Sequence, residues 1–137
     1  MNKKTFEKIS EMRISEAKAL RDSSCFAGAY YLCGYAIECA LKACVSKQVR
    51  ENDFPDKELA NKAHTHNLER LLSISGLEPD YVRDIKNNEQ LKVNWAIIKD
   101  WNEASRYRVD IDKEEAHDLI DACIGDHGIL DWIKAKW

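Results

Sequence analysis

The chain has 137 residues, of which 45% are hydrophobic and 33% are charged, and its formal net charge is −3. This length and composition predict one globular domain spanning residues 1–137. The slight acidic excess excludes nucleic-acid binding through bulk positive charge, so any contact with RNA or a nucleotide needs a local patch. With only five glycines and two prolines, and no apolar–polar alternation, the chain is predicted to be all-α.

The first half of the chain predicts three helices. Apolar residues three and four apart predict the first over about residues 5–22, and Ser23 or Ser24 would cap a long second helix over about residues 24–49. A polar connection leads to a shorter third helix, which Thr65 or Asn67 would cap.

The second half continues the same compact bundle of about five helices. Gly76 ends the helix before it, and Pro79 suits the first turn of a short helical segment. A further helix starts near Glu89 and is followed by a loop, Ser105–Ile111. Asp112, with a glutamate three residues later, gives a capping-box-like start to one last helix, whose apolar positions continue through Ile133.

The second predicted helix holds the stretch CFAGAYYLCGYAIECALKACV, residues 25–45, which has roughly membrane-spanning length. Glu38 and Lys42 lie within it, so we expect a buried helix of a bundle and no membrane contact. Four of the five cysteines lie there too, and without a secretion signal they indicate reduced thiols and a cytoplasmic protein. Because this helix is apolar around most of its circumference, a second copy of the chain could cover one side, which predicts a homodimer.

Glu38 projects toward the packed side of this helix, where a carboxylate has to be paired or hydrogen-bonded. Lys42 lies one turn later, but such a pair is worth only about 0.2–0.5 kcal/mol on an exposed face. Arg106 and Arg108 are the better predicted partners, because a guanidinium can grip a carboxylate with two hydrogen bonds. Such a pair would pin the loop to the helix or line a polar pocket for a phosphate, and the residues favour the structural role.

Few other residues suggest chemistry. His64 and His66 lack ligands at zinc-finger spacing, so they are interpreted as loop histidines, and we expect no metal and no cofactor. Tyr107, flanked by two arginines, is the aromatic residue best placed to meet a ligand. His117, on the last helix, is the histidine that could meet an arginine of this loop.

The stretches AYYLCGYAIECALKA, HNLERLL and WNEASRYR together resemble the HEPN (higher eukaryotes and prokaryotes nucleotide-binding) family. The likeness runs from about Arg13 to Trp132, and its most specific part is Tyr35–Lys42. The resemblance implies a helical bundle that commonly dimerises. It also implies either a metal-independent ribonuclease or a non-catalytic nucleotide-binding protein, found in toxin–antitoxin, anti-phage and CRISPR-linked systems or beside a nucleotidyltransferase.

The ribonucleases of that family carry an arginine followed, after four to six residues, by a histidine. Here ten residues separate Arg106 from His117 and eight separate Arg108 from it, so the motif is missing. We therefore expect a non-catalytic or weakly active module that binds a nucleotide or RNA phosphate through Arg106, Tyr107 and Arg108. Glu38 would orient Arg106 at a polar cleft on the dimer face.

Two alternatives remain from the sequence. The first is a metal-independent endoribonuclease that uses Arg108 with His117, the arginine on the phosphate and the histidine as general acid or base. The second is a structural homodimer that binds a partner protein. A nucleotidyltransferase or an antitoxin is the partner that the family resemblance implies.

Overall fold

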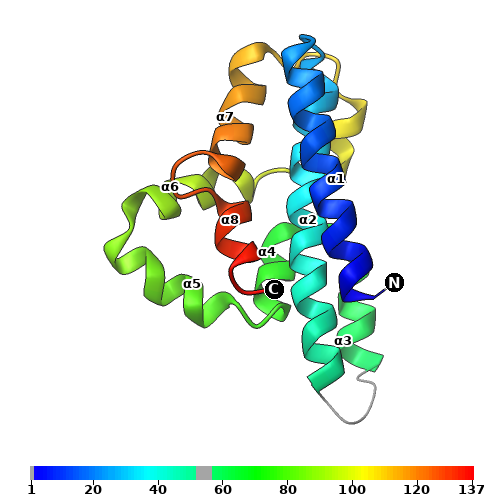
Figure 1. Cartoon of the computed structure of the whole chain (residues 1–137), viewed down its shortest axis with the longest axis vertical. Coiled ribbons are helices and arrows are strands. Elements are labelled where there is room, and N and C mark those ends of the chain that lie inside the picture. The colour runs from blue at the N-terminus through cyan, green and yellow to red at the C-terminus, as the bar shows by residue number, and fades with distance from the viewer. Residues whose placement is uncertain (1, 52–56) are drawn as a thin grey trace.

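The computed structural model describes residues 2–51 and 57–137, and within these ranges the chain forms helices and no strand. The predicted all-α fold is therefore confirmed. The two longest helices, α1 (Lys3–Asp22) and α2 (Phe26–Glu51), form an antiparallel pair (Figure 1). The shorter α-helices and the 3-10 helices η1 and η2 follow in the order α3 (Lys57–Lys62), α4 (Leu68–Ile74), α5 (Glu78–Asp84), η1 (Ile85–Asn87), α6 (Glu89–Ile98), η2 (Glu103–Tyr107), α7 (Lys113–Ile124) and α8 (Ile129–Lys134).

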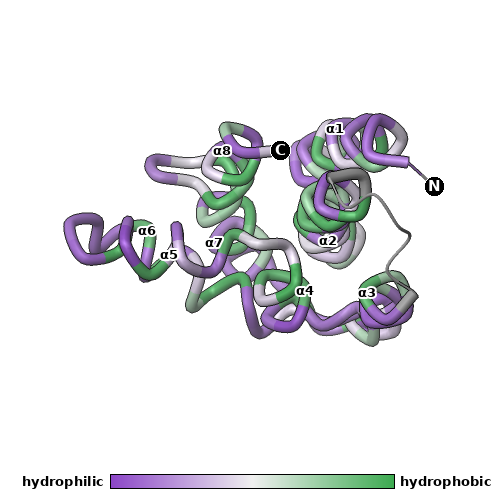
Figure 2. The backbone as a smooth tube through the Cα atoms, turned by 90° about the horizontal axis from the view of Figure 1, so that it is seen from below, coloured by the Kyte–Doolittle hydropathy of each residue, from purple (hydrophilic) through white to green (hydrophobic). Residues whose placement is uncertain are grey.

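Helix α2 is the centre of the fold. It contacts α1, α3, α4, α7, α8 and η2, and Figure 2 shows α1, α8, α4 and α3 on different sides of it. Small residues let the neighbouring backbones come close, since Ala36 and Ala40 are fully buried. The buried hydroxyl of Ser10 on α1 donates a hydrogen bond to the Ala36 carbonyl over 2.7 Å. The chain's own elements thus bury much of α2, and that burial does not require a second copy.

Several predicted helix ends are found in the structure. The Asn67 and Asp112 side chains each accept a hydrogen bond from the backbone N–H three residues later, over 3.0 and 2.8 Å. Gly76 has a φ of +82°, the left-handed conformation that glycine adopts readily after a helix. The prediction that Ser23 or Ser24 caps the start of α2 was wrong. Ser23 caps the C-terminus of α1, and Ser24 has a φ of 59° in the turn.

The predicted last helix is two helices in the structure. Helix α7 ends at Ile124 and α8 begins at Ile129, with Gly125 and Gly128 between them and His127 at a φ of 54°. The Asn94 amide holds this turn from α6, because its Nδ2 donates to the carbonyls of Asp126 and His127 over 3.1 and 2.9 Å. The predicted loop at Ser105 also differs, since η2 occupies part of it.

Two contacts fix the segments that follow α2. A Cβ added to Gly34 would lie 2.3 Å from atoms of the Trp101 indole, so the ring lies directly on the α2 backbone and holds η2 beside it. On the other side of the bundle, Trp132 Nε1 donates to Asp84 Oδ2 over 2.9 Å and joins α8 to α5. That hydrogen bond, more than the nearby cations, lowers the pKa of Asp84 below its ordinary value.

Candidate functional site

The first part of the candidate site is the exposed pair Arg106 and Tyr107 on η2. The Asn102 side chain caps η2 by accepting a hydrogen bond from the Ala104 N–H over 2.9 Å. The Arg106 guanidinium lies 4.8 Å from the centre of the Tyr107 ring, and Tyr107 is 73% exposed. Hydrogen bonding to Tyr107, and more weakly to Tyr31, raises the pKa of Arg106 above its ordinary value. Within the described residues no carboxylate forms an ion pair with Arg106.

Arg108 was predicted to face the ligand, but the structure places it in a network with acidic residues. Its guanidinium donates to both carboxylate oxygens of Glu115, over 2.6 and 3.0 Å, and to Asp110 over 3.1 Å. These two carboxylates also raise the pKa of Arg108 well above its ordinary value. Arg108 therefore ties the segment after η2 to the first turn of α7, and most of its donors are used.

The predicted pairing of Arg108 with His117 is not found in the structure. The His117 ring packs against Phe26, with ring centres 6.4 Å apart, while the Arg108 guanidinium lies over the Tyr30 ring, 5.9 Å from its centre. His117 is two residues beyond Glu115, so on a helix the two side chains point away from each other. Arg108 and His117 consequently have no contact through which to share a reacting phosphate.

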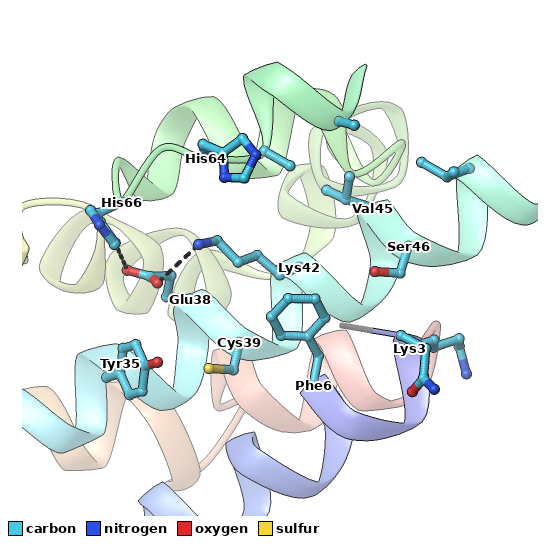
Figure 3. A pocket seen from close by; sticks show the side chains of 14 residues that line it. Lys3, Phe6, Tyr35, Glu38, Cys39, Lys42, Val45, Ser46, His64 and His66 are labelled. Carbon is cyan, nitrogen blue, oxygen red and sulfur yellow. Dashed lines mark hydrogen bonds and ion pairs between the residues drawn. The ribbon is translucent and has the colours of Figure 1, made fainter. Parts of the chain in front are cut away.

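The second part of the candidate site surrounds Glu38, whose side chain is 2% exposed. Its Oε2 lies 3.2 Å from Lys42 Nζ, and its Oε1 lies 2.9 Å from His66 Nδ1 (Figure 3). The prediction that Glu38 pairs with Arg106 was therefore wrong. The burial of Glu38 was anticipated correctly, but Lys42 is only 15% exposed, so the small energy expected of an exposed pair does not apply.

His66 was missed as a partner because its position depends on tertiary structure. It lies in the connection between α3 and α4, which folds back over α2 and brings the imidazole to the Glu38 carboxylate. A histidine nitrogen next to a carboxylate donates the hydrogen bond, so Nδ1 carries the proton in this arrangement. The interpretation of His66 as a plain loop histidine is therefore corrected.

A pocket of about 540 Å³ opens beside this buried carboxylate, between α1, α2, α3 and the connection that follows α3 (Figure 3). Its apolar walls come from Phe6, Val45, Val49, Ala60 and Ala63, and Lys42, His64 and His66 add polar groups. Cys39 also lines the pocket, but burial, followed by the charge of Glu38, raises the pKa of its thiol to about 11. At neutral pH Cys39 is therefore a thiol and a poor nucleophile.

Stacked tyrosines on α2 connect the two parts of the site. Tyr31 and Tyr35 are one turn apart with ring centres separated by 6.2 Å, and Tyr31 also stacks on Trp101 with centres 6.0 Å apart. Tyr31 lies at the Arg106 end, while Tyr35 lines the pocket. The arginine–tyrosine surface and the pocket thus lie along one side of the same helix.

Neither a metal-ligand cluster nor a membrane-spanning helix is found among the described residues. Within residues 2–51 and 57–137, no cluster of three or more histidine, cysteine, aspartate or glutamate side chains is arranged to hold a metal ion. None of the helices described there combines the length and apolar character needed to cross a membrane.

The chain was compared with known proteins at three levels. It matches no protein-family description, no curated protein and no solved structure. The HEPN resemblance therefore stays a prediction, and the function has to be argued from the geometry of the site.

Proposed function

We propose that the chain is a HEPN-like module that binds a nucleotide or RNA phosphate as a component of a toxin–antitoxin or anti-phage system. The family resemblance is the source of the system assignment, and the all-α bundle is compatible with it. A non-catalytic or weakly active module is favoured over an enzyme, because Arg108 and His117 are held apart by other contacts.

The observation that carries this proposal is the exposed Arg106–Tyr107 pair. The Arg106 guanidinium contacts aromatic rings, and its charge is not neutralised by a carboxylate within the described residues. A guanidinium presents N–H groups in a planar fork that suits a phosphate, and an exposed aromatic face can stack with any base. Neighbouring Tyr31 would extend the aromatic surface along α2.

The test is fluorescence anisotropy of a labelled single-stranded oligouridylate titrated with the protein at several salt concentrations. Binding to phosphate should weaken as salt increases. Arg106→Gln and Tyr107→Ala should each weaken binding by about tenfold, since one stacked base is worth about 1–3 kcal/mol. Lys92→Gln is the matched control, because it removes one exposed positive charge from α6 and should leave affinity within about twofold.

Absence of binding by the unmodified protein, or equal losses in all three variants, would reject this proposal. The endoribonuclease alternative is examined with the same RNA in excess chelator. We expect no cleavage above background. Cleavage that disappears in His117→Ala would replace the binding proposal with that activity.

Homodimerisation remains part of the proposal, although the fold no longer requires it. Because other elements of the chain already contact α2, a second copy is not needed to bury its apolar side. Light scattering of the purified protein measures the mass directly, and a monomer at high concentration would remove this part of the proposal.

A further inference from the structure

The pocket beside Glu38 is not used by the proposed function, which depends on the η2 surface. At about 540 Å³ it falls within the range of sites that hold one small organic molecule. Its walls come from two parts of the chain, α1–α2 and α3 with the connection after it, so the folded structure is needed to form it. The Phe6 ring forms one wall and the His64 ring lies on the opposite side (Figure 3).

The apolar walls determine one part of the ligand. Val45 and Val49 lie one turn apart on α2, and Ala60 on α3 and Ala63 just after it also line the pocket. Together with Phe6 they favour a flat or branched apolar body, because burying such a body releases water from both surfaces. An ion surrounded by water would gain little from these walls.

The polar groups of the lining determine the charge of the other part of the ligand. Glu38 is the one carboxylate among the described lining residues, and its two oxygens already contact Lys42 and His66. A positively charged ligand would therefore find no accessible partner of opposite charge. Lys42 Nζ has three N–H donors and uses one on Glu38, and His64 and His66 are both exposed at the opening. The second lysine of the lining, Lys3, is paired with Glu7 on α1.

From this combination we infer that the pocket binds a small organic anion: a carboxylate or similar acid attached to an apolar body of about two fused rings. The acid group lies near Lys42 and the two histidines, and the apolar body lies between Phe6 and α3. This site is separate from the Arg106–Tyr107 surface, so it does not depend on whether that surface binds RNA.

The probe for this inference is 2-naphthoate, with 2-naphthylmethanol as a neutral molecule of nearly the same shape. Titration calorimetry of the full chain should show binding of 2-naphthoate. The alcohol should bind about tenfold more weakly, because a hydrogen bond from a charged donor is worth about 1.5–3 kcal/mol. His64→Ala removes the imidazole donor at the opening and should weaken 2-naphthoate binding severalfold.

A matched pair of tryptophan substitutions locates the site. Ala60 and Ala96 are both exposed alanines on helices, but only Ala60 lines the pocket. Ala60→Trp should fill the pocket and weaken binding by at least about tenfold, whereas Ala96→Trp should change it by less than about twofold. Thermal melts check that both variants fold. The comparison of affinities is valid when Ala60→Trp and its control Ala96→Trp have the same melting temperature.

Three results would overturn the inference. The first is no binding of 2-naphthoate at millimolar concentration. The second is equal binding of the acid and the alcohol, which would show an apolar site without preference for an anion. The third is equal affinity in folded Ala60→Trp and Ala96→Trp, which would place the ligand elsewhere. Any of these can occur while Arg106→Gln still weakens RNA binding, so the two proposals fail separately.

Discussion

Replacing Glu38 by glutamine tests whether the buried carboxylate stabilises the fold. The chain contains a natural comparison, because Glu38–Lys42 and Glu58–Lys62 have the same helical spacing and the same N–O distance of 3.2 Å. They differ in burial, since Glu38 is 2% exposed and Glu58 is 80% exposed. Any difference between Glu38→Gln and Glu58→Gln therefore reports the environment of the pair.

The expected magnitudes are well separated. Removing one partner of a buried ion pair costs about 3–5 kcal/mol, because the other charge stays buried. Here Lys42 and His66 keep some contact with water, and the glutamine amide can still accept one hydrogen bond, so we expect about 2–3 kcal/mol for Glu38→Gln. Glu58→Gln should cost no more than about 0.5 kcal/mol, as exposed pairs do.

The assay is urea unfolding followed by far-ultraviolet circular dichroism. The two variants should share one m-value, so that the difference between their midpoints measures stability alone. Equal midpoints for Glu38→Gln and Glu58→Gln would refute the reasoning that burial gives the Glu38 pair its importance. A changed m-value would instead show that the substitution altered the folded or unfolded ensemble.

Three further predictions use other contacts. Gly34→Ala should lower stability by about 2 kcal/mol, because its methyl group meets the rigid Trp101 indole. Gly28→Ala should change stability by less than about 1 kcal/mol, because there the methyl group meets only the flexible end of the Leu20 side chain. Equal urea midpoints for the two variants would contradict this. The pKa of Asp84 is lowered in the folded state, so its contribution to stability is present above the ordinary carboxyl pKa and is lost as the pH falls through the folded pKa. In urea titrations at successively lower acidic pH, the unmodified chain should lose its stability advantage over Asp84→Asn. An advantage that stays constant with pH would disprove this prediction. Cys25 is exposed whereas the other four cysteines are buried, so a thiol-reactive dye should label one cysteine in a fast phase, and Cys25→Ser should abolish this fast phase. A fast phase that persists in Cys25→Ser would contradict the prediction.

Much of the helical structure could be predicted because it depends on local chemistry. Asp112 was recognised as a cap and Asn67 was one of two candidates, since a short polar side chain before an apolar repeat satisfies the free N–H groups of the first turn. The break between α7 and α8 was missed because the apolar repeat continues through it. Both helices pack on the same core, so the pattern keeps its phase, and Gly125 and Gly128 were the local signal of the break.

The candidate site was less predictable. The burial of Glu38 followed from its helical position, but its partner His66 lies 28 residues away and reaches it only because the connection after α3 folds back over α2. Arg108 was assigned to the ligand by its residue type, although Glu115 on the next helix uses its donors. The pocket left no local signal, because three separated segments, residues 2–6, 35–49 and 60–66, supply its walls.

The close pairing of α1 with α2 has a consequence for how the chain folds. The turn between Asp22 and Phe26 is short, so bringing these helices together costs little loop-closure entropy. Helices α7 and α8 return to α2 from far along the chain and close a much longer loop. We therefore expect the α1–α2 pair to form early and to be the last part to open. The central backbone amides of α1 and α2 should exchange with deuterium more slowly than those of α7 and α8. Faster exchange in α1 and α2 than in α7 and α8 would contradict this order.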